Sequence, residues 1–132
     1  MIDSPRIPVS GIDADALKRA MRSLPAAVSV VTAGIGDDRT GATVTSVASF
    51  SMAPPTMMVS LNRSSSTWQA VQRYGHFCIN VLRDDQQAVA ERFAGRGGLR
   101  GAHRYAQDAW APLATGALAL EGAVAAIDCE LE

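Results

Sequence analysis

The fold is decided by the stretch TGATVTSVASFSMAPPTMMVSLNRSSSTW, residues 40–68. Its first part has the alternation of a β-strand, in which successive side chains point to opposite faces. One face is small and mostly apolar, and the other carries most of the hydroxyls: Thr43, Thr45, Val47, Ser49 and Ser51. Small side chains let a planar ligand approach the backbone, whose N–H and C=O groups can bind the edge of a ring. The same pattern also fits an ordinary strand with its polar face in water.

The serine run at the end of this stretch predicts the start of a helix. Ser66 or Thr67 is expected to cap a helix over 68–74, which Gly75 ends. Free N–H groups of the first turn, several hydroxyls and the nearby Arg63 would together attract an anion, most naturally a phosphate. A capped helix beside a solvated arginine explains the segment equally well.

The rest of the chain predicts short strands and helices around this stretch. Pro54 and Pro55 lack a backbone N–H and are expected at a corner. The predicted elements are a helix over 13–24, strands over 28–32, 42–51, 56–61, 77–82 and 124–131, a turn over 34–38, a helix over 86–93 and a glycine-rich loop over 95–101. The first two strands are expected to form an antiparallel hairpin.

Length and composition indicate one globular domain. The chain has 132 residues, a net charge of -1, 48% hydrophobic and 19% charged residues. We therefore expect a single domain over 13–132, preceded by an irregular arm over 1–12. Balanced charge argues against nucleic-acid binding, and no apolar run approaches the roughly 20 residues that cross a membrane. The N-terminus lacks the pattern of a secretory signal, so a cytoplasmic location is expected.

Cysteine and histidine residues lack the spacing of a metal or redox site. Cys78 and Cys129 are far apart in apolar runs and are expected to be reduced core residues without a disulfide. His76 and His103 have no partner at metal-ligand spacing, so no metal site is predicted.

Four sequence blocks carry a resemblance to a known family. They are GATVTSVASFSMAPP, MMVSLNRSSSTW, FCINVL and ERFAG, in this order from residue 41 to residue 95. The chain resembles the flavin reductase family, whose members include the reductase components of two-component flavin-dependent monooxygenases. The resemblance implies a mainly β fold with flanking helices, an FMN-binding split β-barrel of Greek-key-like topology. It also implies NAD(P)H-dependent reduction of FMN or FAD, a homodimer and a partner oxygenase.

The resemblance also implies which residues contact the flavin. It assigns the ring, ribityl chain and phosphate to Thr43, Val44, Thr45, Ser46, Ala48, Ser49, Ser60, Leu61, Asn62, Ser66, Thr67, Arg92 and Phe93. Among these, Ser66 and Thr67 are expected at the phosphate, and Arg92 at the phosphate or the ribityl chain. A solvated Arg92 beside a core Phe93 is the alternative. No catalytic side chain is expected, because the cofactor carries the hydride chemistry.

The chain departs from the family after its last predicted strand. Relatives continue with a Gly-Asp-His turn and further strands, whereas this sequence stops at Glu132. The barrel is therefore expected to lack its C-terminal strands. A flavin-binding module without turnover, acting as a carrier or sensor, and an inactive fragment are the alternatives to an active reductase.

Overall fold

The computed structural model describes residues 14–16, which are helical, and residues 27–132. The predicted arm over 1–12 and most of the predicted helix over 13–24 lie outside the described residues. The β-strands are β1 (Ser29–Ala33), β2 (Thr40–Val44), β3 (Ala48–Met52), β4 (Pro55–Met58), β5 (His76–Val81), β6 (Trp110–Pro112), β7 (Leu118–Leu120) and β8 (Ala125–Glu130). The helices are α2 (Ser66–Tyr74) and α3 (Gln87–Phe93), with 3₁₀ helices η1 (Gly36–Asp38), η2 (Asp84–Gln86) and η3 (Gly101–Tyr105).

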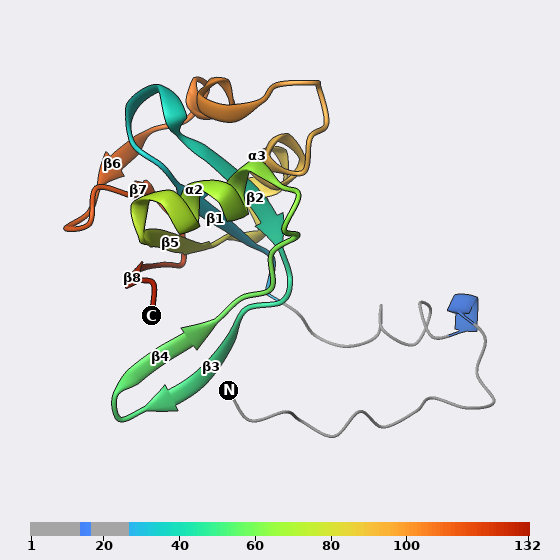
Figure 1. The fold of residues 1–132 in the computed structure, drawn as a ribbon. Helices are drawn as coiled ribbons and strands as arrows, with labels where there is room; N and C mark the ends of the chain where they lie inside the picture. The colour runs from blue at the N-terminus through green and yellow to red at the C-terminus, as the bar shows by residue number, and fades with distance from the viewer. Residues whose placement is uncertain (1–13, 17–26) are drawn as a thin grey trace.

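A four-stranded antiparallel sheet in the order β2-β1-β5-β8 forms the centre of the fold (Figure 1). The predicted hairpin is confirmed, because β1 pairs antiparallel with β2. Strand β1 also pairs with β5, and β5 pairs with β8, both antiparallel. The two inner strands, β1 and β5, therefore contribute side chains to both faces of the sheet.

Two apolar cores lie on opposite faces of this sheet, as strand alternation requires. Val31 and Ile79 are opposite each other on β1 and β5, and they pack with Val71 of α2. On the other face, Val30 packs with Phe93 of α3 and with residues of η3 and β7. The sheet is thus covered by α2 on one side and by α3, η3 and β7 on the other.

Two hairpins complete the described part of the chain. β3 and β4 pair with each other in a separate two-stranded sheet that projects from the body (Figure 1). β6 and β7 form the second hairpin, which the sequence patterns did not predict. This hairpin packs on the central sheet, where Leu120 of β7 belongs to the same core as Val30.

A polar network around the buried Asn80 and Thr32 side chains joins the β6–β7 hairpin to the central sheet. The side-chain amide of Asn80 donates to the Val30 carbonyl at 3.1 Å and accepts from the Leu120 N–H at 2.8 Å. The Thr32 hydroxyl donates to the Leu118 carbonyl at 2.6 Å. A buried amide left without partners costs free energy, so these bonds fix where β7 lies.

The predicted strand over 42–51 is wrong as a single element. The structure divides it into β2 and β3, with residues 45–47 outside either strand. The division arises because β2 pairs with β1 whereas β3 pairs with β4. A bulge between Ser49 and Ser51 further interrupts the alternation, so the predicted hydroxyl face does not continue from one strand to the other.

The proline corner is shifted from its predicted place. Pro54 lies in the turn after a cis Ala53–Pro54 peptide bond, but Pro55 already belongs to β4, where it is opposite Met52. An edge position in a two-stranded sheet tolerates a residue that has no N–H to donate.

We expect Asn80→Ala to lower the free energy of unfolding by about 1–3 kcal/mol for each of the two backbone groups it leaves unpaired. Urea denaturation measures this loss. Gln87→Ala is the control, because Gln87 is exposed and bonds only to Glu91 within α3. The control should change stability by less than about 0.5 kcal/mol. Equal effects of the two substitutions would contradict the role of the buried network.

Candidate functional site

The break between β2 and β3 exposes a short polar junction. Thr45, Ser46, Ala48 and Ser49 are all exposed there. The Ser46 hydroxyl donates to the Ser60 carbonyl at 3.2 Å and accepts from the Ser60 N–H at 3.1 Å. This pair of bonds brings the predicted residues of the first strand together with those that follow β4.

A tight turn connects this junction to α2. The Asn62 side-chain oxygen accepts from the N–H of Ser64 at 3.0 Å and from its hydroxyl at 2.8 Å. The Ser65 hydroxyl donates to the Asn62 carbonyl at 2.7 Å and accepts from the Trp68 N–H at 3.1 Å. Ser65 is therefore the N-cap, one residue before the predicted Ser66, and Asn62 holds the turn that positions it.

The first turn of α2 is suited to bind an anion. Ser66 is exposed, and its hydroxyl lies 2.6 Å from that of Thr40 on β2. The N–H groups of Ser66 and Thr67 have no carbonyl partner within the helix, because they belong to its first turn. The positive end of the helix dipole adds to their attraction for negative charge. Gly75 ends the same helix in a left-handed conformation with φ of 74°, as predicted.

Thr43 and Val44 lie on opposite faces of β2. The Thr43 hydroxyl donates to the Ala90 carbonyl of α3, so it connects the strand to that helix. Val44 packs against the core below α2. Both side chains stabilise the fold, so a ligand would contact the backbone of these two residues.

Arg92 and Phe93 also have other partners. The Arg92 guanidinium donates to the Asp108 carboxylate and, at 3.0 Å, to the Gln107 side-chain oxygen. Phe93 is 1% exposed in the core beneath β2. The structure does not bring these two side chains together with the other predicted residues, and no spacing rule in the sequence links residues 92 and 108.

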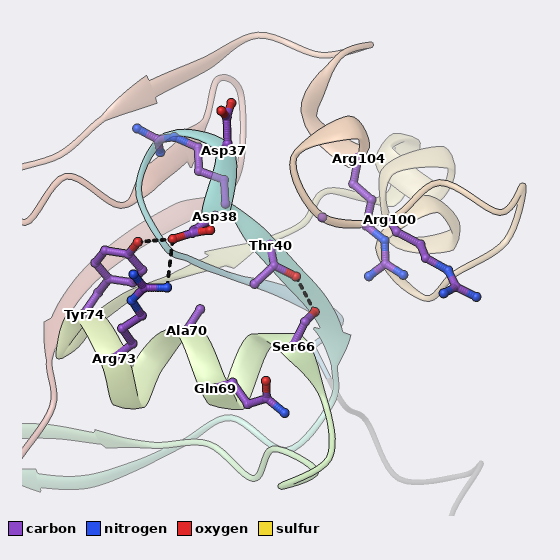
Figure 2. Close-up of a pocket in the computed structure, with 12 residues that line it drawn as sticks. Asp37, Asp38, Thr40, Ser66, Gln69, Ala70, Arg73, Tyr74, Arg100 and Arg104 are labelled. Carbon is purple, nitrogen blue, oxygen red and sulfur yellow. Dashed lines mark hydrogen bonds and ion pairs between the residues drawn. The ribbon is translucent and has the colours of Figure 1, made fainter.

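A cavity of about 480 Å³ lies beside α2, between η1 and the start of η3 (Figure 2). Ser66 is the single residue of the predicted flavin contacts that lines it. Charged residues dominate its wall, which contains Asp37, Asp38, Arg39, Arg73, Arg100 and Arg104. Sequence patterns missed this site because its residues come from three separate segments with no common motif.

The arginines of the cavity differ in how firmly they are held. Arg104 donates to the carbonyls of Gly41 and Leu99 at 2.8 Å and of Phe93 at 3.2 Å, so its guanidinium is fixed. Arg39 donates to the Gly116 carbonyl at 3.2 Å. The Arg100 side chain has no hydrogen-bond or ion-pair partner within the described part of the chain. It is the arginine of this cavity most available to a ligand.

The end of the cavity away from Ser66 contains a carboxylate, a guanidinium group and an aromatic ring. Tyr74 donates from its hydroxyl to Oδ2 of Asp38, and Arg73 contacts the same oxygen at 3.2 Å (Figure 2). The hydrogen bond to Asp38 raises the pKa of the Tyr74 hydroxyl above its ordinary value. The Arg73 guanidinium lies 5.4 Å from the centre of the Tyr74 ring. Oδ1 of Asp38 takes part in neither contact.

The two cysteines are free, as predicted. Burial raises the pKa of Cys78 to about 12, so its thiol is protonated at neutral pH. Among residues 14–16 and 27–132, no group of three or more His, Cys, Asp or Glu residues could hold a metal ion. In the same ranges, no helix is long and apolar enough to span a bilayer.

A family model described as a flavin reductase like domain matches residues 21–132. This chain belongs to the flavin reductase-like family. FMN reductase (NADH) RutF 2 of Methylorubrum extorquens is 43% identical over 120 residues, which cover 91% of this chain and 69% of that protein. The chain spans 64% and 59% of the length of two further RutF reductases from the same species.

Solved flavin reductases have the same fold. BorF, the flavin reductase component of a bacterial two-component tryptophan halogenase, is 33% identical with a TM-score of 0.80, covering 91% of this chain and 75% of BorF. The NADH:FAD oxidoreductase SgcE6 of Streptomyces globisporus, in complex with NAD and FAD fragments, is 26% identical with a TM-score of 0.80. That match covers 96% of this chain and 74% of SgcE6. The predicted split-barrel fold of the flavin reductase-like family is confirmed.

We expect Ser65→Ala to destabilise the protein by about 1 kcal/mol, because it removes the N-cap of α2. Ser64→Ala is the control, since the Ser64 hydroxyl bonds only to Asn62 in the exposed turn. Its effect should stay below about 0.5 kcal/mol. Urea denaturation compares the two variants, and a larger loss in Ser64→Ala would contradict the assignment of Ser65 as the cap.

Proposed function

We propose that this chain is a reductase that uses NADH or NADPH to reduce FMN or FAD. The observation that carries the proposal is the position of Ser66, which begins α2 directly after the turn from the polar junction and also lines the arginine-rich cavity. A flat ring suits the small exposed residues of the junction, and a phosphate suits the hydroxyls and free N–H groups of α2. Membership of the flavin reductase-like family supports the same reading.

The proposed flavin contacts lie at the end of β2, in the junction and in the turn that leads to α2. Most of them are exposed or half-buried, whereas Thr67 is only 1% exposed and would contact a phosphate through its backbone N–H. The flavin ring would lie against the end of β2 and the junction. The residues there would contact it through their side chains or their backbone, and they are Thr43, Val44, Thr45, Ser46, Ala48 and Ser49. Ser60, Leu61 and Asn62 would border the opposite side, and Ser66 and Thr67 would bind the phosphate. Arg92 would act from a distance, by holding the segment after α3 through Asp108. Phe93 would support β2 from below.

The protein's own part in the reaction is to bind and orient. A bound flavin supplies two-electron transfer chemistry, between a reduced nicotinamide and an acceptor. Backbone N–H groups at the junction would stabilise negative charge on a reduced ring. We assign no side chain the role of a general acid or base and no residue the role of a metal ligand.

A flavin-dependent oxygenase is the proposed consumer of the reduced flavin. The styrene monooxygenase flavin reductase of Pseudomonas putida S12 has the same fold, and BorF is the reductase component of a two-component halogenase, so relatives of this chain work with a separate partner enzyme. We also propose that the protein works in the cytoplasm, where the unpaired Cys78 and Cys129 would stay reduced.

NADH and NADPH oxidation by the purified chain, with FMN, with FAD and without flavin, tests the proposed reaction. We expect oxidation that requires both the protein and a flavin. Quenching of flavin fluorescence by a folded chain that oxidises neither nucleotide would instead indicate a binding module without turnover. Absence of both signals would overturn the assignment.

The substitution Ser66→Asp tests whether Ser66 contacts the flavin phosphate. A carboxylate there would repel the phosphate but would suit the first turn of a helix, so the fold should be preserved. We expect FMN affinity to fall at least tenfold, which is about 1.4 kcal/mol. Riboflavin, which has no phosphate, is the control ligand and should bind the variant and the natural chain equally well. An equal loss for both ligands would contradict a phosphate contact at Ser66.

We further propose that the chain forms a homodimer through the β3–β4 hairpin. Phe50, Met52 and Met58 are 67%, 82% and 48% exposed on this hairpin, which projects from the body (Figure 1). An isolated two-stranded hairpin is marginal in water, and clustered exposed apolar residues are typical of interfaces. A second copy that covers them would also approach Ala48 and Ser49, which begin β3.

We expect Met52→Ser to raise the dimer dissociation constant at least tenfold. Val124→Ser is the control, because Val124 is 66% exposed but lies outside the hairpin. Light scattering coupled to size exclusion gives the mass, and the natural chain should have twice the monomer mass of 13.9 kDa. A monomeric natural chain, or equal weakening by both substitutions, would contradict the hairpin interface.

A further inference from the structure

The cavity beside α2 extends well beyond the proposed phosphate position. It is lined by Ser66 at the first turn of the helix and by Arg73 and Tyr74 at the last. The eight-residue separation from Ser66 to Tyr74 corresponds to roughly 12 Å along the axis. FMN ends at its phosphate, so if the proposed function is right, FMN would leave most of this cavity empty. The inference that follows rests on that proposed function.

Charge changes along the cavity. Arg104, which is fixed, lies on the side of the Ser66 end, and the side chain of Arg100 extends outward beyond it (Figure 2). Arg100 has no hydrogen-bond or ion-pair partner among the described residues. The opposite end contains the Asp38 carboxylate beside the planar groups of Tyr74 and Arg73. Both of these contacts are made by Oδ2, and Oδ1 has no hydrogen-bond partner in the part of the chain that the structure describes. One end therefore suits phosphate, and the other suits a neutral group that donates hydrogen bonds and has a flat face.

We propose that this cavity binds the adenosine 5′-phosphate half of FAD. Arg100 would contact the second phosphate of the dinucleotide. Oδ1 of Asp38 would accept from ribose hydroxyls or from the adenine amino group, and the Tyr74 and Arg73 planes would contact the purine. The volume of about 480 Å³ is within the range of roughly 300–1,000 Å³ typical of small-molecule sites. The chain would then prefer FAD to FMN.

NADH carries the same adenosine 5′-phosphate group, so the test must separate the two sources. We assign the cavity to FAD because Ser66, the proposed contact of the flavin phosphate, lines its wall. A tail attached to that phosphate would enter the cavity directly. A nicotinamide nucleotide would have to reach the cavity past the flavin phosphate.

Calorimetric titration of the purified chain with FMN, FAD and AMP tests the proposal. We expect FAD to bind at least tenfold more tightly than FMN, and AMP to compete with FAD but not with FMN. Asp38→Asn should weaken FAD and AMP three- to tenfold and FMN less than twofold, because it removes a charged acceptor without changing the size of the side chain. Tyr74→Leu is a second variant for the same end of the cavity and should have the same selectivity.

Two control variants match the substitutions in the cavity. Asp85→Asn alters an exposed aspartate that contacts Arg83 at 3.0 Å, much as Asp38 contacts Arg73, but lies outside the cavity. Arg100→Ala should weaken FAD more than Arg96→Ala does, since Arg96 is an exposed arginine of the same loop that does not line the cavity. The controls should bind both flavins as the natural chain does.

The titrations separate failure of this inference from failure of the proposed function. Absence of binding by both FMN and FAD would overturn the proposed function, and the AMP titration would still report on the cavity. Equal affinity for FMN and FAD, with no selective effect of Asp38→Asn, would overturn the adenylate site. If Asp38→Asn raised the KM for NADH with FMN as acceptor and left the FAD to FMN affinity ratio unchanged, the assignment to FAD would be overturned.

Discussion

The buried side-chain amide of Asn80 is the constraint on which the rest of the structure depends. It lies on an inner strand, and both ends of the amide are used: one donates to β1 and the other accepts from β7. Because an unpaired buried amide is costly, β7 must lie against this face of the sheet, and Thr32 adds a second bond to the same hairpin. α2 therefore covers the opposite face, where its first turn meets β2.

The β6–β7 hairpin in turn positions the cavity. Trp110 of β6 packs against Phe93 and Tyr105, with ring centres 5.4 and 4.8 Å away, and the Tyr105 hydroxyl donates to the Thr40 carbonyl. Gly41 makes this packing possible, since a Cβ at residue 41 would lie 2.8 Å from the Phe93 ring. The aromatic cluster thus holds η3 against β2, which places Arg104 of η3 and the preceding Arg100 along one side of the cavity.

The groups of this fold that can bind a ligand are the charged and polar groups that are not held by other parts of the protein. Arg92 and Arg104 serve the fold, because each is hydrogen-bonded to fixed partners. The Arg73–Asp38 pair is largely exposed, so it adds little to stability and can yield to a ligand. Within residues 14–16 and 27–132, the Arg100 side chain has no hydrogen-bond or ion-pair partner, and Arg100 and Ser66 of the first turn of α2 line the same cavity.

Local patterns in the sequence determined several strands of the central sheet and the end of α2. Short apolar runs predicted strands within one residue of β1, β5 and β8, and the glycine after α2 predicted its end, because these features depend on neighbouring residues alone. Tertiary structure decided the break at 45–47, where the chain changes pairing partner, the pairing of Arg92 with Asp108 and the assembly of the cavity. Each of these joins residues distant in the chain, and side-chain periodicity contains no information about which distant segments will meet.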